Sequence, residues 1–177
     1  MLPASFFIGL LSIGSPLRLL WIFSSIYFWF WYIGIKNAGR QFYVSGDYVK
    51  AVAAFKEEIA KNPKSDEAHF NLGLAYGKLG DRQSEINSYE EAIIHNPNVP
   101  EIYFNLGTAY NDLEHFNNAK EVLNEAIRLR PDYLKAHYIL CKIYAATGDR
   151  ENAMKEYNAI QKLDKSTADE LLSVING

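Results

Sequence analysis

The pattern of hydrophobic and polar residues divides the chain into two parts of different character. Up to residue 35 nearly every position is uncharged, and Arg18 is the one charged side chain. After residue 35, apolar residues recur three and four positions apart between charged ones, which predicts amphipathic α-helices. Glycine–aspartate pairs at 46–47, 80–81 and 148–149 interrupt this pattern, as is typical where one helix ends and the next begins. The second part is therefore predicted to be all-α.

The helical part repeats itself every 34 residues. Rows that start at residues 32, 66, 100 and 134 agree at several columns. The seventh and eighth columns read Ala-Gly, Leu-Gly, Leu-Gly and Leu-Cys, and the thirty-second column is proline in the first three rows. One helix pair cannot bury its apolar face alone, so a period of this length predicts pairs that stack into a right-handed solenoid. The eleventh column holds the aromatic residues Phe42, Tyr76, Tyr110 and Tyr144.

This pattern resembles the tetratricopeptide repeat family, whose Leu-Gly…Tyr…Ala…Phe…Pro order it follows over more than three quarters of the chain. Single columns depart from it, with Glu85 in place of alanine and Glu114 in place of the turn glycine. After the last row, Ser166 and Asp169 have the spacing of a capping box and predict a further helix that caps the stack. The resemblance implies repeats at residues 32–65, 66–99, 100–133 and 134–165, followed by the capping helix at residues 166–177.

The apolar first part is long enough to anchor the chain in a membrane. Ser15 and Pro16 are typical of a helix start, and a helix over residues 16–35 would be about 30 Å long, the thickness of a hydrocarbon core. It contains all three tryptophans of the chain, which favour the boundary between lipid and water. A cleaved signal peptide and a buried helix are the alternatives, but the basic n-region of a signal peptide is missing. We expect a transmembrane anchor at residues 16–35, preceded by a hydrophobic tail at residues 1–15.

The orientation of this anchor follows from the basic residues that flank it. Lys36, Arg40, Lys50 and Lys56 lie after the span, whereas Arg18 and the α-amino group are the positive charges at its other end. Because basic residues near a span favour the cytosolic side, the repeats are predicted to face the cytosol. The periplasmic or lumenal side is the alternative.

Composition and motifs exclude most kinds of chemistry. A net charge of −3 over 177 residues argues against a nucleic-acid binder, and one cysteine excludes an intrachain disulfide. His69 and His137 lie two repeats apart, too far to share a metal ion, and are predicted to be packing residues. Cys141 falls in a close-packed column and is predicted to be an inert buried thiol. Without a phosphate loop or a nucleophile motif, the chain is predicted to have no catalytic activity, cofactor or small-molecule substrate.

The resemblance also implies a binding face. Tetratricopeptide repeats bind peptides along a concave face formed by the first helix of each pair, where side-chain amides can pair with a peptide backbone and rings supply apolar area. Such amides and rings are common throughout the family, so they indicate the fold as much as a ligand. Basic residues at both ends could bind an acidic residue or a terminal carboxylate. The implied contact residues are Lys36, Arg40, Phe70, Asn71, Lys78, Phe104, Asn105, Asn111, Tyr138 and Lys142.

The carboxylate clamp of chaperone-binding members is matched only in part. Lys36 and Asn71 match it, but Arg40, Glu101 and Asn105 differ from the residues expected there. The sequence therefore predicts a membrane-anchored scaffold or adaptor whose partners are a protein or peptide ligand and membrane lipid. The alternative is a structural subunit of a larger membrane complex, packed through the anchor helix and the edge of the solenoid.

Overall fold

The computed structural model describes residues 38–176, apart from the side chains of residue 170 and of residues 173–176. The predicted tail at 1–15, the predicted anchor at 16–35, the start of the first repeat and Lys36 lie outside the described residues. Among the residues that are described, no helix combines the length and the apolar character needed to cross a membrane.

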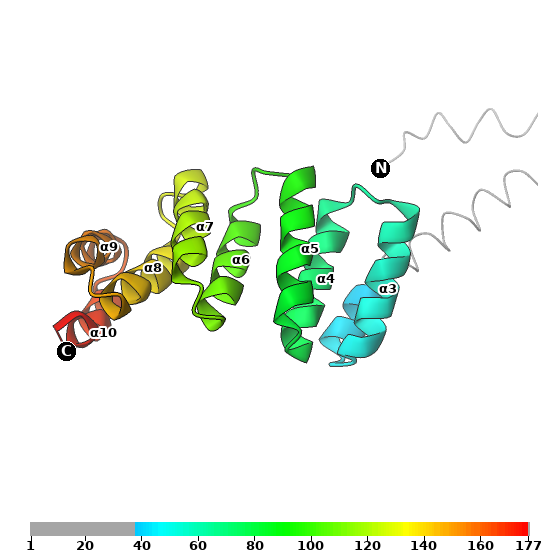
Figure 1. Ribbon diagram of the computed structural model, residues 1–177, viewed down its shortest axis with the longest axis horizontal. Helices are drawn as coiled ribbons and strands as arrows, with labels where there is room; N and C mark the ends of the chain where they lie inside the picture. The colour runs from blue at the N-terminus through cyan, green and yellow to red at the C-terminus, as the bar shows by residue number, and fades with distance from the viewer. Residues whose placement is uncertain (1–37, 177) are drawn as a thin grey trace, which may run out of the picture. The chain divides into compact units, whose positions relative to one another are not determined.

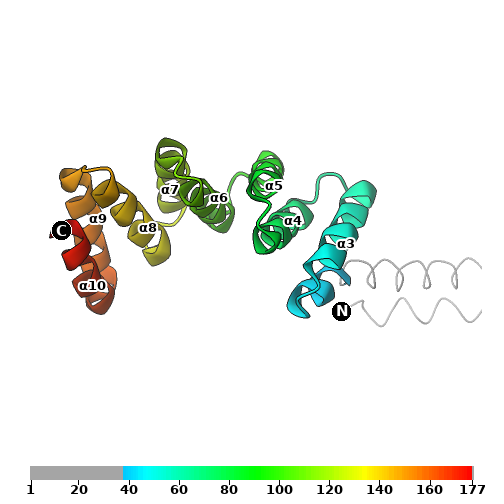
Figure 2. The same cartoon turned by 60° about the horizontal axis from the view of Figure 1, so that its bottom comes forward.

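The described part is a row of antiparallel helix pairs (Figures 1 and 2). Residues 38–44 are helical and form the first pair with α3, since Gly39 lies against the ring of Phe55. Each helix packs against the helix before it and the helix after it along the chain, as expected for a solenoid. The helices that follow are α3 (Tyr48–Lys61), α4 (Asp66–Leu79), α5 (Arg82–His95), α6 (Pro100–Asp112), α7 (Phe116–Leu129), α8 (Leu134–Ala146), α9 (Arg150–Leu163) and α10 (Lys165–Asn176).

The predicted glycine–aspartate turns are confirmed. Gly46, Gly80 and Gly148 have φ angles of 82°, 78° and 77°, in the left-handed region that ends a helix. The aspartate after each glycine caps the next helix, as when the side chain of Asp81 accepts a hydrogen bond from the backbone N–H of Ser84 at 3.1 Å. These turns set the two helices of each pair side by side.

The turn between α6 and α7 has the same shape without a glycine. Glu114 takes the left-handed position with a φ of 57°, and among residues 38–176 it is the one residue other than glycine with positive φ. The chain closes this turn as it closes the others, because the N–H of His115 donates to the carbonyl of Tyr110 at 2.9 Å. A side chain in this backbone region is strained, so Glu114 costs stability that a glycine would not.

The core lies between successive pairs as well as within them. Buried residues of α3 pack on α4, those of α5 on α6, and those of α7 on α8, so each cluster joins one repeat to the next. Within the pairs, a glycine in the first helix admits a large side chain of the second. A Cβ on Gly73 would lie 2.5 Å from the ring of Tyr89, and one on Gly107 would lie 2.6 Å from Leu123. The eighth column of the repeat is therefore small because the two helices of a pair touch there.

The last helix closes the stack, although it begins differently from the prediction. Ala168 and Leu171 of α10 are buried against α8 and α9, as a capping helix requires. The capping side chain is Asp164, which accepts from the N–H of Ser166 at 2.9 Å and from its hydroxyl at 2.6 Å. The predicted capping box headed by Ser166 was therefore wrong by two residues.

Candidate peptide-binding face

The first helices of the pairs share one side of the array. Besides their sequence neighbours, α6 packs directly on α8 and α8 on α10, so these alternate helices lie close together. We call the surface that they form the inner face, made by residues 38–44 and by α4, α6, α8 and α10. The predicted contact residues that the structure describes all lie on these helices.

In the first two repeats, an ion pair between two helices uses part of the charge of the inner face. The Arg40 guanidinium forms an ion pair with Glu67 on α4, so neither group is free for a ligand's charge. Phe70 on α4 is half-buried and its ring packs on Tyr89, with the ring centroids 5.7 Å apart. Lys78 lies exposed near the end of the helix, and Asn71 is half-buried.

In the third repeat, polar groups of the inner face are also partly used within the protein. Asn105 donates through its side-chain N–H to the carbonyl of Glu101 at 2.7 Å, and the Glu101 carboxylate forms an ion pair with Arg130. Partial burial opposes ionisation of Glu101, but the hydrogen bond and the charge of Arg130, together with a backbone hydrogen bond, outweigh it and lower the pKa of this carboxyl. Phe104 packs its ring on Tyr133 at 5.1 Å, and Asn111 is half-buried.

A further ion pair joins the second repeat to the third. Arg82 at the start of α5 lies 2.7 Å from Glu85 and 2.5 Å from Asp112 at the end of α6. Glu85 is nearly buried, and its other oxygen accepts a hydrogen bond from the Tyr89 hydroxyl at 3.3 Å. It has room for its side chain because Gly77 faces it, where a Cβ would lie 2.6 Å from the carboxylate. Glu85 therefore replaces the usual alanine without leaving its charge unpaired.

The fourth repeat places two basic residues, neither of them paired with an acidic residue in the described part of the chain, beside a cavity on the inner face. Among the described residues, neither Lys135 nor Lys142 forms an ion pair, and the Lys142 ammonium lies over the ring of Tyr138 at 5.6 Å from its centroid. Beside them is a cavity of about 270 Å³, lined by residues of α6, α8 and α10. The lining residues are Phe104, Leu134, Lys135, Tyr138, Ile139 and Thr167. The structure thus gathers Phe104, Tyr138 and Lys142 of the predicted set at one place.

His137 has a role that the sequence did not reveal. Its ring is buried in α8, with Nδ1 2.6 Å from a carboxylate oxygen of Glu156 on α9 and Nε2 2.9 Å from the carbonyl of Pro131. Both partners are acceptors, so both ring nitrogens must donate and the imidazolium is the favoured form. The hydrogen bond to Glu156 raises the pKa of His137, and burial opposes that rise only in part. His137 therefore ties three segments of the last repeat together.

The surroundings of His69 and Cys141 are not those of a reactive site. His69 bonds the carbonyl of Pro63 at 3.0 Å and stacks near His95, a contact between rings that the spacing did not predict. Cys141 is fully buried, as predicted, and burial raises the pKa of its thiol to about 11. Among the described residues, no group of three metal-ligating side chains comes together.

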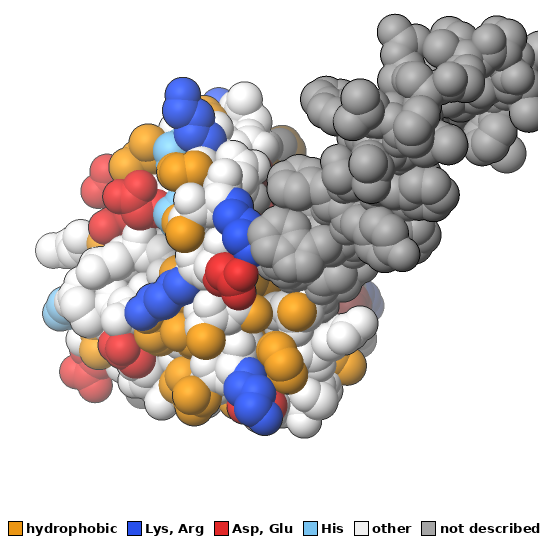
Figure 3. All heavy atoms as spheres, turned by 90° about the vertical axis from the view of Figure 1, so that its right-hand side faces the viewer, with side chains coloured by type: hydrophobic (Ala, Val, Ile, Leu, Met, Phe, Trp, Pro, Cys, Tyr) orange, Lys and Arg blue, Asp and Glu red, His pale blue; other side chains and the backbone are white. Residues whose placement is uncertain are grey.

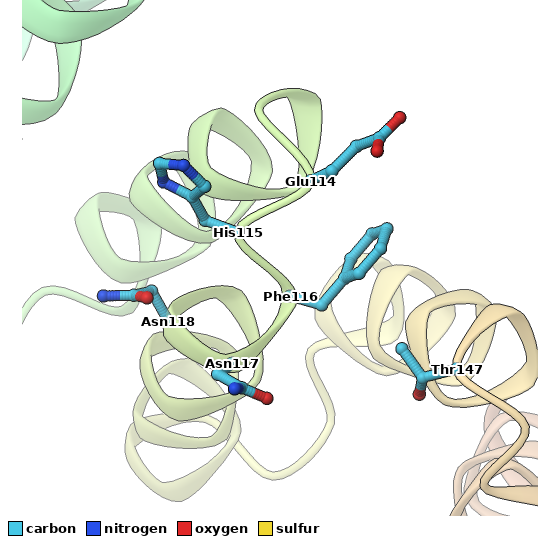
Figure 4. Close-up of a pocket in the computed structure, with 6 residues that line it drawn as sticks. All are labelled: Glu114, His115, Phe116, Asn117, Asn118 and Thr147. Atoms are coloured by element: carbon cyan, nitrogen blue, oxygen red, sulfur yellow. The ribbon is translucent and has the colours of Figure 1, made fainter.

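A second cavity, of about 390 Å³, lies at the turns rather than on the inner face. It is lined by residues 114–118 of the α6–α7 turn and by Thr147 at the end of α8 (Figure 4). Glu114 and Phe116 point toward the side of Thr147, whereas His115 and Asn118 point to the opposite side (Figure 4). Because these side chains diverge, they offer no common point at which a substrate could be held.

The end of the array at α3 carries charges of both signs. In Figure 3, lysine and arginine side chains are spread singly among acidic and apolar ones over the described surface in view. A nucleic-acid interface would instead gather basic residues on one face.

Solved structures share this fold at low sequence identity. A MamA protein matches with 22% identity and a TM-score of 0.72, over 82% of this chain and 88% of its own. The first TPR domain of Spaghetti (RPAP3), bound to the HSP90 peptide SRMEEVD, matches with 21% identity and a TM-score of 0.64, over 66% of this chain and 93% of its own. YrrB, described as a TPR protein with an unusual peptide-binding site, matches with 19% identity and a TM-score of 0.68, over 75% of this chain and 69% of its own. A comparison with curated proteins finds no match.

Family models match most of the helical part. A model of the TPR repeat matches residues 39–80, and a model of the tetratricopeptide repeat matches residues 66–97, 100–133 and 134–167. These matches follow the helix pairs of the structure and cover more than half of the chain. The chain therefore belongs to the tetratricopeptide repeat family, whose members are typically non-enzymatic scaffolds.

Proposed function

We propose that this protein is a scaffold that binds partner proteins through an extended segment laid along its inner face. The observation that carries the proposal is the fourth repeat, where an apolar cavity shares one helix surface with two lysines that have no acidic partner in the part of the chain that the structure describes. An aromatic ring and an aliphatic wall can bury an apolar side chain, and unpaired ammonium groups attract a carboxylate. Binding and positioning, rather than chemistry, would be the mechanism.

Two proteins of the same fold support this proposal. The Spaghetti structure holds a peptide that ends in acidic residues, and YrrB is described by its peptide-binding site. Their identity to this chain is low, so the support extends to the type of ligand and not to its sequence.

The structure argues against a ligand of the chaperone-tail type. A terminal carboxylate in the first repeats would meet Arg40 already paired with Glu67, and in the third repeat it would meet the carboxylate of Glu101. Among the described residues of these repeats, Lys78 and Asn71 offer one cation and one amide, fewer than a clamp for two carboxylates needs. We therefore place the main contacts in the third and fourth repeats.

The scaffold would be held at a membrane by residues 16–35. This inference rests on the apolar run and on its three tryptophans. The basic residues after the run favour the cytosolic side for the repeats. Extraction of membranes with alkaline carbonate tests the anchor, since a spanning protein stays in the pellet. Protease treatment of sealed, right-side-out membranes then tests the side, because cytosolic repeats are digested only after the membrane is opened.

A structural role in a larger complex is favoured by a different observation. Val44, Val49 and Ile94 are 85%, 67% and 69% exposed, which is high for large apolar side chains. Such residues fit a permanent contact with another subunit. Light scattering on the detergent-solubilised protein distinguishes the two roles: a scaffold is monomeric without its partner, and a structural subunit purifies in a stable assembly.

Selection from a peptide library tests the scaffold proposal. The full chain in detergent is the bait, and a variant with Asn71→Ala, Tyr138→Ala and Lys142→Ala is the counter-bait. The proposal predicts peptides that bind the wild type and are lost on the variant, while the circular dichroism of the two proteins agrees. Peptides that bind both proteins equally would show that binding does not involve the inner face.

A further inference from the structure

The cavity of the fourth repeat is built from three helices, one of which is the capping helix. Phe104 comes from α6, Tyr138 and Ile139 come from α8, and Thr167 comes from α10. The floor is preformed, since the ring of Phe104 packs on Tyr133 with 5.1 Å between centroids. Thr167 is fixed by the start of α10, where its hydroxyl donates to Asp164 at 2.9 Å. A hydrogen bond therefore holds the side chain that forms the α10 wall in place.

The size and lining of the cavity fit one apolar side chain. Its volume of about 270 Å³ lies below the ~300–1,000 Å³ of pockets that enclose small-molecule ligands. Two aromatic rings, two aliphatic side chains and the stem of Lys135 make up most of the surface, so a polar group inside would lose its hydrogen bonds to water. The cavity therefore selects a large apolar side chain carried by a longer ligand.

The charge around the cavity selects the neighbours of that side chain. Three arginines elsewhere on the array are neutralised: Arg40 by Glu67, Arg82 by Asp112 and Arg130 by Glu101. In contrast, Lys135 and Lys142 have no acidic partner among the described residues. The rim of this cavity therefore carries two positive charges that no acidic residue in the described part of the chain pairs with.

The spacing on α8 defines the pattern of the ligand. Lys135, Tyr138 and Lys142 are three and four residues apart, so they form one stripe along the helix with the ring between the two ammonium groups. Seven residues of helix rise about 10 Å, the length of about three residues of extended chain. Because alternate residues of an extended chain face the same side, two acidic residues placed two positions before and two positions after an apolar residue, about 13 Å apart, can reach the two lysines while the apolar side chain enters the cavity.

We propose that this cavity, with Lys135 and Lys142, binds an extended peptide segment in which a large apolar residue lies between two acidic residues, and that α10 is a wall of this site as well as the cap of the stack. The proposal rests on the proposed scaffold function and adds the chemistry of its partner. It assigns specificity to the last repeat and to a helix that would otherwise serve only to cover the core.

Fluorescence anisotropy with short labelled peptides tests the pattern. The probe is Gly-Ser-Asp-Gly-Leu-Gly-Glu-Ser, titrated with the full chain in detergent. One comparison peptide has alanine in place of leucine, and the other has asparagine and glutamine in place of the two acids. We expect the alanine peptide to bind at least about tenfold more weakly, because the leucine side chain loses its burial. The amide peptide should also bind more weakly, and its affinity should depend less on salt.

Protein variants locate the contacts. Lys142→Glu and Lys135→Glu should weaken binding of the acidic peptide about tenfold or more, and Lys162→Glu, the same charge change on the exposed surface of α9, should not. Thr167→Phe fills the cavity from the α10 side. It should remove the difference between the leucine and alanine peptides and leave the affinity for the alanine peptide unchanged. Thermal unfolding of each variant controls for the fold.

Two peptide results would overturn the inference: the leucine probe does not bind, or it binds no more tightly than the alanine peptide. An equal loss of affinity with Lys162→Glu and with Lys142→Glu would also overturn it. Each of these results is compatible with a scaffold that binds other segments on its inner face, as a library selection would still show. Failure of the library selection would instead remove the scaffold function itself.

Discussion

Glu156 on α9 holds the buried ring of His137 on α8, with 2.6 Å between its carboxylate oxygen and Nδ1. The carbonyl of Pro131 accepts from the other ring nitrogen, so the charged imidazolium is fully bonded and the neutral ring would lose one of the two hydrogen bonds.

This arrangement makes the last repeat more stable at low pH than at high pH. The hydrogen bond to Glu156 raises the pKa of His137 in the folded state above its unfolded value. The stabilisation is therefore complete below the unfolded pKa of about 6.5 and is lost as the pH rises through the folded pKa. We expect His137→Gln to cost about 1–3 kcal/mol of unfolding free energy at pH 6 and clearly less at pH 9. Urea unfolding at both values measures this, and a cost independent of pH would contradict it.

Substitutions of Glu85 and Gly77 are predicted to have non-additive effects on the free energy of unfolding. A Cβ on Gly77 would meet the Glu85 carboxylate at 2.6 Å, and that carboxylate is held by Arg82 and Tyr89. In the wild type, Gly77→Ala must displace this group, which offsets the gain in helix propensity. In a Glu85→Ala background the same change should stabilise the protein by about 1 kcal/mol. A double-mutant cycle in urea measures the coupling, and effects that add within about 0.5 kcal/mol would show that the two sites are independent.

Gly73 is predicted to tolerate no side chain, unlike Gly77. Its Cβ would lie 2.5 Å from a ring atom of Tyr89, which is fully buried and cannot swing into solvent. Gly73→Ala should therefore destabilise the protein by about 1–3 kcal/mol, as overpacking of a core does. Thermal unfolding beside Gly77→Ala provides the comparison, and equal melting temperatures for the two variants would contradict the account.

Glu114 is predicted to be a site where glycine is better than the natural residue. Its φ of 57° lies in the left-handed region, which the other three turns fill with glycine. Glu114→Gly should raise the unfolding free energy by about 1 kcal/mol, because the strain is relieved. Glu121→Gly, an exposed change within α7, is the matched control and should lower it by about 1 kcal/mol. A loss of stability with Glu114→Gly would mean that its side chain, not its backbone, matters at this turn.

The helices and turns were predictable because their signals are local and periodic. The glycine–aspartate pairs mark where one helix ends and the next begins. The small residues of the eighth column mark where the two helices of a pair touch. The start of α10 was misplaced because Ser166 and Asp164 can both cap a helix, and only the hydrogen bonds show that Asp164 does so.

The sequence predicts which helix face carries the candidate site. It does not predict which side chains of that face are already paired with other residues of the protein. The repeat columns place Phe70 and Arg40 on the inner face, yet Phe70 packs on Tyr89 and Arg40 pairs with Glu67. These pairings join residues from different helices, and a column pattern carries no information about them. The cavity beside Tyr138 also depends on α10, which stands outside the repeat and so outside its pattern.

The central claim is that a partner binds to the inner face of the fourth repeat. Photo-crosslinking in the native host tests this claim most directly. A photoreactive phenylalanine derivative replaces Tyr138 on α8 in one variant and the exposed Asn158 on α9 in another. The account predicts discrete crosslinked products from position 138, weakened by Lys142→Glu, and none of these products from position 158. Products from position 158 with none from position 138 would contradict it and place the partner on the other side of the array.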